Sequence, residues 1–143
     1  MSKKIILAVD DDPAMQSLYF SIFRRHAKEF VLQLSPSGED ALFLLEQKKP
    51  DLLLLDWNLP GINGIEVLKR VRSNETTKSL PVIMVTSEEE PTKRIAALEE
   101  GADQYMSKYF LVDELIVRIR RELRRRDGGL NPFKFLASLA AWR

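Results

Sequence analysis

A run of four leucines followed by an aspartate, Leu52–Leu55 and Asp56, constrains the fold of this chain more than any other stretch. Four apolar residues without polar alternation are typical of a strand that is covered on both faces, as in the middle of a parallel sheet. Pro60, Gly61 and Gly64 break the chain soon afterwards. Asp56 is therefore predicted to lie at the carboxyl end of the strand, where open α/β sheets place their ligands. The alternative is an aspartate that only caps the next turn.

Patterns typical of strands and helices alternate along the whole chain. We expect strands at residues 5–9, 30–34, 52–55 and 81–85, and a short one through 105–106. Five helices are expected. The first begins at residue 13, the second runs from the SPSGED stretch to residue 47, and the third begins after residue 63. The fourth runs from residue 91 to the glycine at 101, and the fifth begins at about residue 112. Such alternation predicts an α/β domain with a parallel sheet and helices on both of its faces. At 143 residues the chain fits one domain and not a second full one.

Several side chains have a predicted place in the helices. Asp12 precedes a proline and is expected to be an N-cap. Asn63, with Glu66 three residues later, resembles a capping box. In the helix that begins at 91, we expect Ile95 and Leu98 to lie on the apolar face.

The net charge by itself predicts neither a nucleic acid nor a membrane as the partner, because 22 basic residues are balanced by 21 acidic ones. The segment Arg118–Arg126 contains six arginines and one glutamate, and we expect it to be a solvated helix face rather than a nucleic-acid site. The absence of cysteine suits a reducing compartment. We find no signal-peptide pattern and no stretch of ~20 apolar residues, so we expect a cytoplasmic protein without membrane insertion.

Reactive side chains follow four of the expected strands. Asp10 and Asp11 follow the first strand as Asp56 follows the third, while Thr86 and Lys108 follow the fourth and fifth. Three carboxylates brought together repel one another, and a hard divalent cation with oxygen ligands relieves the repulsion, with Mg²⁺ the natural candidate. A carboxylate can accept a phosphoryl group covalently. Lys108 and Thr86 could then hold the other phosphate oxygens.

At this point the sequence resembles a known family over about residues 3 to 126, the receiver domains of bacterial two-component response regulators. The resemblance rests on the acidic pair after the first strand, DWNLPGING around Asp56, MVTS at the fourth strand and EGADQYMSK before the lysine. It implies a flavodoxin-like (CheY-like) five-stranded parallel sheet in the order 2-1-3-4-5. It also implies a signalling switch whose partner is a sensor histidine kinase or a phosphotransfer protein.

The resemblance assigns a role to each acid at this edge of the sheet. Asp56 would be the phosphoacceptor. Asp10, Asp11 and Asp56 would place Mg²⁺ together with the backbone carbonyl of Asn58. These four residues form the expected metal site.

The resemblance also implies how the switch works. Thr86 and Lys108 would sense the phosphate, and Tyr105 would change rotamer when Thr86 moves. A homodimer would form through the fourth helix, the fifth strand and the fifth helix, on charged positions at Arg94, Glu99, Asp103, Glu114 and Arg118. Gln104 departs from this pattern, where a second acid is usual.

Two further departures lead to predictions. Tyr109 follows Lys108 where receivers usually have a proline with a cis bond, and a non-proline cis bond costs about 3 to 4 kcal/mol. We therefore expect a trans bond, a displaced or mobile loop over 108–112, and a Lys108 that reaches Asp56 less rigidly. The receiver is expected to span 1–127, with Gly128 and Gly129 opening a short apolar appendage, 128–143. We expect Pro132–Arg143 of this appendage to pack as a short helix on the body or on a neighbouring chain.

There are two alternatives to a phosphorylation switch, of which the first stays open and the second is disfavoured by the residues. A pseudo-receiver would keep the fold as an interaction module and not switch. A haloacid-dehalogenase-like phosphatase would need a second acid two residues after the nucleophile, and Asn58 occupies that position. Because every acid and both phosphate ligands are present, switching is favoured.

Overall fold

The computed structural model describes residues 2–127, in which five strands and five helices alternate. The strands are β1 (Lys4–Val9), β2 (Phe30–Ser35), β3 (Leu52–Leu55), β4 (Val82–Thr86) and β5 (Gln104–Ser107). The helices are α1 (Pro13–Arg25), α2 (Gly38–Gln47), α3 (Gly64–Ser73), α4 (Pro91–Glu99) and α5 (Val112–Arg126). The expected alternation is confirmed. The appendage predicted at 128–143 lies outside the described residues.

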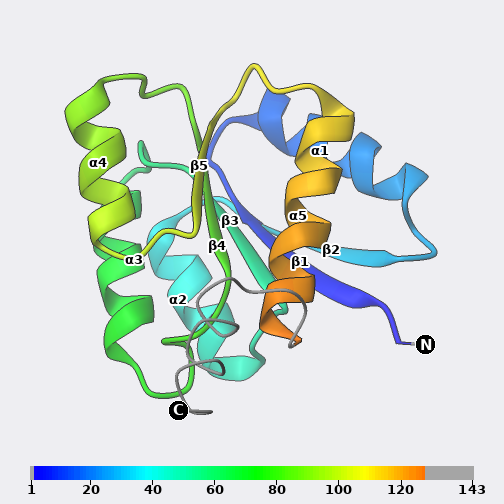
Figure 1. Ribbon diagram of the computed structural model, residues 1–143, viewed down its shortest axis with the longest axis horizontal. Coiled ribbons are helices and arrows are strands. Elements are labelled where there is room, and N and C mark those ends of the chain that lie inside the picture. Colours follow the sequence, from blue (N-terminus) through cyan, green and yellow to red (C-terminus); the bar gives the residue numbers. More distant parts are fainter. Residues whose placement is uncertain (1, 128–143) are drawn as a thin grey trace, which may run out of the picture.

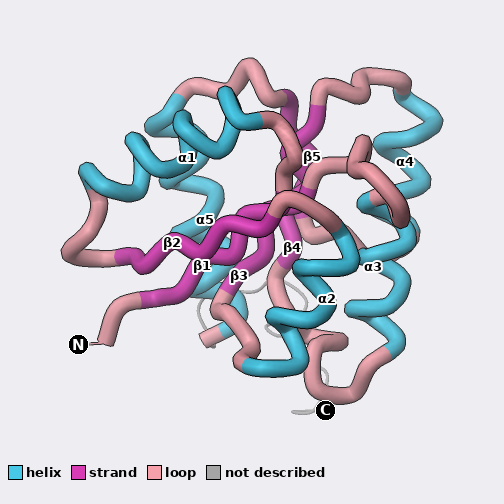
Figure 2. Tube along the Cα trace, turned by 180° about the vertical axis from the view of Figure 1, so that it is seen from behind, coloured by secondary structure: helices cyan, strands magenta, loops and turns pink. Residues whose placement is uncertain are grey.

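All five strands are parallel and lie in the order β2-β1-β3-β4-β5, the flavodoxin-like order that the family resemblance implies. Helices α1 and α5 cover one face of the sheet, while α2, α3 and α4 cover the other (Figures 1 and 2). The strands therefore lie between two helical layers, with β2 and β5 at the two edges.

The side chains of β3 alternate between the two helical layers. Leu52 and Leu54 pack in the cluster beneath α1 and α5, whereas Leu53 and Leu55 pack in the cluster beneath α2, α3 and α4. All four leucines are fully buried, and burial of such a side chain stabilises the fold by roughly 1.5–3 kcal/mol. A slip of one residue would exchange the two clusters, so the position of Asp56 at the end of β3 is firmly set.

Polar side chains begin the helices as the sequence predicts. The Asp12 carboxylate accepts a hydrogen bond from the amide of Ala14 at 3.0 Å, and Asn63 Oδ1 accepts one from the amide of Glu66 at 3.0 Å. The Glu66 carboxylate pairs with Arg70 at 3.3 Å. The structure thus contains the Asn63 half of the predicted capping box, with the Glu66 side chain engaged on the next turn.

Helix α4 differs from the expectation. Its buried residue is Ala97, whereas Ile95 and Leu98 are 52% and 43% exposed, so the apolar face expected at these two residues is not the face that packs on the sheet. The side chain of alanine is small, and α4 therefore meets the sheet along Ala97 with its larger apolar side chains outside the contact. Two apolar side chains of α4 are left accessible to solvent.

Arg72, which was not identified from the sequence pattern, connects three segments of the chain. The guanidinium of Arg72, near the end of α3, donates to the carbonyls of Lys78 (3.1 Å), Leu80 (2.7 Å) and Gly101 (2.7 and 2.9 Å). It also lies 3.1 Å from the carboxylate of Asp103. Burial lowers the pKa of Arg72, and Asp103 opposes that shift. The contact ties α3 to the start of β4 and to the turn between α4 and β5.

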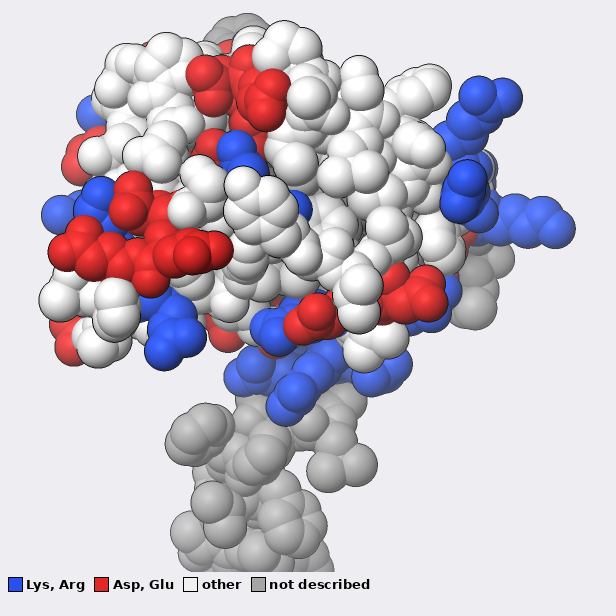
Figure 3. All heavy atoms as spheres, turned by 90° about the horizontal axis from the view of Figure 1, so that it is seen from above, with Lys and Arg blue, Asp and Glu red and all other residues white. Residues whose placement is uncertain are grey.

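The arginine-rich stretch of α5 is largely paired with acids of the same chain. Arg118, Arg120, Arg125 and Arg126 each lie within 3.2 Å of a carboxylate, and groups of both signs are interspersed on the face that Figure 3 shows. This pairing is as expected for a solvated helix face. Within residues 2–127, none of the helices has both the length and the apolar character needed to cross a bilayer.

Candidate functional site

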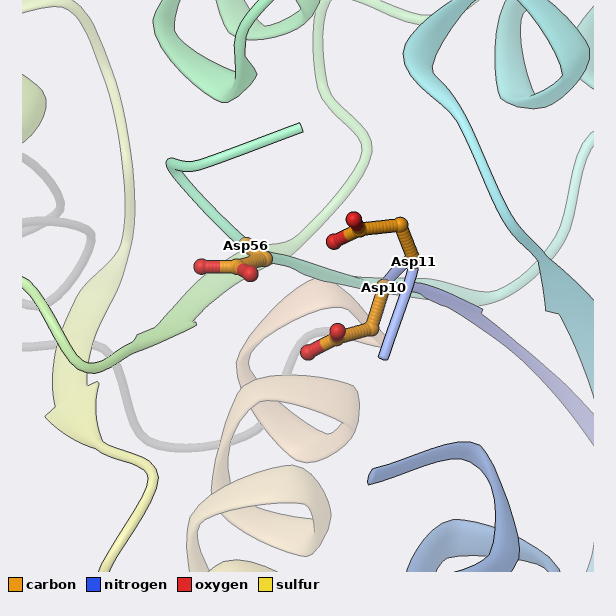
Figure 4. A group of neighbouring side chains, drawn as sticks. All are labelled: Asp10, Asp11 and Asp56. Atoms are coloured by element: carbon orange, nitrogen blue, oxygen red, sulfur yellow. The ribbon is translucent and has the colours of Figure 1, made fainter. Parts of the chain in front are cut away.

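The carboxyl ends of the two central strands bring three acids together. Val9 and Leu55 are partners in the parallel register of β1 and β3, and the amide of Asp56 donates to the carbonyl of Val9 at 3.1 Å. Asp10 and Asp56, which follow these residues, are therefore neighbours. One oxygen from each of Asp10, Asp11 and Asp56 lies within 4.8 Å of the others. In Figure 4 the three carboxylates lie near one another beyond the ends of their strands.

A single ammonium group faces two of these carboxylates. Lys108 Nζ lies 2.9 Å from Asp10 Oδ2 and 2.9 Å from Asp56 Oδ2. Burial alone would lower the pKa of Lys108, but its contacts with Asp56 and Asp10 outweigh that effect and raise it. Burial raises the pKa of Asp10, although the amide of Asp12 and Lys108 oppose the shift. Lys108 is thus held in its charged form beside a carboxylate that is costly to ionise.

The acids fit a hard cation. Asp10 and Asp56 are almost fully buried, at 1% and 2% exposure, while Asp11 is exposed. Although Asp10 Oδ2 is within ion-pair distance of Lys108, it receives no directed hydrogen bond, and among residues 2–127 it is the buried side-chain oxygen left without one. Three carboxylates exceed the charge of one lysine, and an all-oxygen donor set is the kind that Mg²⁺ prefers. The residues present therefore suit the predicted metal.

Thr86 and Tyr105 both form hydrogen bonds with the backbone of Glu88, a residue that the sequence pattern did not identify. Thr86 ends β4 fully buried, and its Oγ1 accepts a hydrogen bond from the amide of Glu88 at 3.2 Å. The Tyr105 hydroxyl donates to the carbonyl of Glu88 at 2.6 Å. Glu88 thus connects both side chains of the predicted switch to the loop before α4. The only sequence signal for it is the acidic run from 88 to 90 after the strand.

The loop before α4 is also connected to the segment after Asp56. Lys93 Nζ lies 3.0 Å from the Glu88 carboxylate and 5.7 Å from the centre of the Trp57 ring. Lys93, followed by Asn58, lowers the pKa of Glu88. The amide of Asn58 donates to Asp56 Oδ1 at 3.3 Å. Lys93, like Glu88, was not expected at the site, because neither side chain belongs to a strand end.

The bond between Lys108 and Tyr109 is trans, because residues 2–127 contain no cis peptide bond. The lower rigidity expected for Lys108 stays a prediction, but Lys108 does reach both carboxylates. The reason is that the amide of Lys108 is already bonded to the carbonyl of Thr86 at 3.2 Å, before the trans bond redirects the chain. The redirection instead leaves the Tyr109 side chain 85% exposed.

The fold and the site together define a flavodoxin-like α/β domain with a cluster of acids and a lysine at the carboxyl edge of its sheet. A model of the response regulator receiver domain matches residues 6–120, and the chain belongs to this family.

Relatives and solved structures agree with this assignment. The chain is 38% identical to the phosphate regulon transcriptional regulatory protein PhoB of Rhizobium meliloti over 84% of its own length and 52% of the relative. It is 36% identical to the DNA-binding response regulator MtrA of Mycolicibacterium smegmatis, over 85% and 51% of the two chains. The chain thus spans about half the length of these relatives.

Solved receiver domains share the fold over nearly their whole length. The BeF3-activated N-terminal receiver domain of Klebsiella pneumoniae RstA has a TM-score of 0.76 at 31% identity, with 84% of this chain and 98% of that one covered. A CheY-like receiver domain from Methanospirillum hungatei has a TM-score of 0.81 at 26% identity, over 89% and 98% of the two chains.

Proposed function

We propose that this receiver domain is a phosphorylation-dependent switch that accepts a phosphoryl group on Asp56 from a histidine kinase or a phosphotransfer protein. The observation that supports the proposal most directly is the position of Asp56, whose Oδ2 lies 2.9 Å from Lys108 Nζ beside Asp10 and Asp11. A buried carboxylate at a strand end, with a fixed cation beside it, is arranged for attack on an anionic donor.

In the proposed reaction an Asp56 carboxylate oxygen attacks the phosphorus of the donor. The new bond to phosphorus forms as the bond between phosphorus and the donor's imidazole nitrogen breaks, and the electron pair stays with the imidazole. Bound Mg²⁺ would offset negative charge on the phosphoryl oxygens, and Asp10, Asp11, Asp56 and the Asn58 carbonyl are the residues that would hold it. Lys108 would pair with a phosphoryl oxygen through its ammonium group.

The proposed response passes through Thr86. If its hydroxyl turns to the phosphate, it gives up the hydrogen bond from the Glu88 amide. Tyr105 holds the carbonyl of the same residue, so movement of the loop before α4 would alter both contacts. The output would then appear at α4, β5 and α5.

Incubation with acetyl phosphate and Mg²⁺ tests the function. We expect one phosphate-sized gain in intact mass, and we expect a chelator added beforehand to prevent it. No gain in the presence of Mg²⁺ would contradict the proposal and favour the pseudo-receiver.

The metal site has its own reporter in Trp57, which lies next to Asp56 and beneath Lys93. In a Trp142→Phe variant, where Trp57 is the remaining indole, we expect fluorescence to change on titration with Mg²⁺ in the millimolar range. An Asp11→Asn variant in the same background removes one carboxylate and should weaken the response. A flat titration of the parent variant would count against the metal site.

We further propose that the phosphorylated form dimerises through α4, β5 and α5. Three of the five charges expected there are already engaged within the chain, because Asp103 lies against Arg72 and Arg118 pairs with Glu114 and Gln104. Exposed ion pairs contribute only about 0.2–1 kcal/mol each. The exposed Ile95 of α4 is therefore the better anchor.

Light scattering with beryllofluoride and Mg²⁺ measures this dimer. We expect a weak dimer that Ile95→Glu abolishes and that Phe43→Glu preserves, since Phe43 is similarly exposed on α2. Monomer alone at high protein concentration would refute the proposed interface.

A further inference from the structure

An apolar groove of about 440 Å³ lies between α1 and the edge strand β2, away from the acid cluster. Its lining is mainly aromatic and aliphatic, with two cations at the rim: Lys3, Phe20, Phe23, Arg24, Ala27, Phe30, Val31, Leu32 and Leu34. Phe20 is 59% exposed and Val31 43% exposed, so the groove is open to solvent in residues 2–127.

An open apolar groove at a sheet edge is unfavourable for a soluble domain. Edge strands with exposed apolar side chains invite pairing with other chains, and proteins usually cover or charge them. The described residues contain ten helices and strands, and none of them covers the Phe20 and Val31 side chains. The groove therefore calls for an occupant.

We propose that residues 132–143 of the same chain dock in this groove as an amphipathic helix. The described chain ends at Asp127, whose carboxylate lies 3.5 Å from Lys4 Nζ. Lys4 is the register partner of Phe30 in β2, and Phe30 lines the groove. The continuation of α5 thus starts one strand away from the proposed site.

The connection is long enough to reach the groove. Residues 128–131, Gly-Gly-Leu-Asn, can extend by roughly 3.3 Å each, about 13 Å in total. Twelve helical residues measure about 18 Å, close to the roughly 20 Å spanned by the six residues of β2. The segment therefore matches the groove in length and lies within reach of it.

The sequence of the segment suits an apolar groove. Asn131 followed by Pro132 is a favourable start for a helix. Phe135, Leu139 and Trp142 recur at helical spacing and would form one stripe. Lys134 would flank this stripe, roughly 100° around the helix from Phe135. A helix of this length is marginal alone in water, so docking would supply the stability that the isolated segment lacks.

Connectivity favours this segment over a separate partner. The cationic rim, Lys3 and Arg24, would also suit an acidic amphipathic peptide. A tethered segment, however, is present at an effective concentration on the order of millimolar, which a free peptide or a second copy at ordinary dilution does not match. The test below separates these occupants.

Trp142 provides a direct measurement. In a Trp57→Phe variant it is the remaining indole, and docking predicts a blue-shifted emission that is protected from acrylamide. Phe20→Glu should remove both the shift and the protection, because it places a charge in the groove at a position exposed enough to tolerate it. Phe43→Glu is the matched control, since Phe43 is 57% exposed on α2, across the sheet from the groove, and it should change neither signal.

Three results would overturn the proposal. The first is water-like emission from Trp142 in the parent variant. The second is protected emission that Phe20→Glu leaves unchanged, which places the segment on another surface. The third is protection that disappears on dilution, which identifies a second copy as the occupant.

Discussion

Replacing Asp56 with asparagine is expected to abolish the phosphate-sized mass gain that acetyl phosphate and Mg²⁺ produce. Asparagine keeps the size of the side chain and removes the carboxylate nucleophile. The other acids of the cluster are not expected to substitute. Asp10 Oδ1 is occupied by the amide of Asp12 at 2.9 Å, and burial raises the pKa of Asp10. Asp11 is exposed and lacks the contact with Lys108.

The control for this variant is Asp12→Asn. It makes the same chemical change next to the cluster, and asparagine is as good an N-cap as aspartate, so both the fold of α1 and the mass gain should persist. The Asp56→Asn protein should also stay folded, because the Asp56 charge disfavours ionisation of Asp10 and its removal relieves that repulsion. An undiminished mass gain in Asp56→Asn would contradict the assignment of the phosphoacceptor.

Replacing Gly64 with alanine is expected to lower the free energy of unfolding by about 3 kcal/mol or more. A Cβ atom at this position would lie 2.1 Å from the carbonyl oxygen of Asp56 and 2.9 Å from the Cα of Trp57. Both are backbone atoms of the acceptor segment, and the amide of Gly64 already donates to the Trp57 carbonyl at 2.8 Å. Relief of the clash would move the start of α3 away from Asp56. Urea unfolding followed by circular dichroism measures the effect.

Gly38→Ala is the matched control for this prediction. A Cβ there would also be crowded, at 2.6 Å from Val67 Cγ2 and 2.7 Å from Ile62 Cγ1, but these are side-chain atoms that can move. We therefore expect a smaller loss of stability than in Gly64→Ala. Equal losses in the two variants would show that backbone contact at Gly64 is not the controlling factor.

Secondary structure and the acid cluster could be predicted because their causes are local or follow from sheet geometry. A leucine run such as 52–55 is stable only when both faces are buried. Once strands end at 9 and 55 in a parallel sheet, Asp10 and Asp56 must meet at one edge. The residues brought to that edge could therefore be named without coordinates, even though their distances could not.

Other features depend on contacts between segments far apart in the chain. Arg72 became a connection between three segments because α3 ends opposite Gly101, which lies 29 residues away. Glu88 and Lys93 joined the site because the loop before α4 folds toward Trp57. The outward position of Ile95 followed from the close approach of α4 at Ala97. No pattern within a single segment contains this information.

The sequence by itself thus determined the order of the elements, the layered α/β architecture and the set of acids with their lysine, since periodicity and strand ends are properties of the chain alone. Only the tertiary structure decided that Lys108 reaches both Asp10 and Asp56 despite a trans bond, and that Asp103 turns to Arg72. The groove beside β2 could also be identified only from the tertiary structure. The physical reason is that a long side chain, or a residue next to a helix, has several possible contact partners in the sequence. Which contact forms depends on the surfaces that tertiary packing brings within a few ångströms.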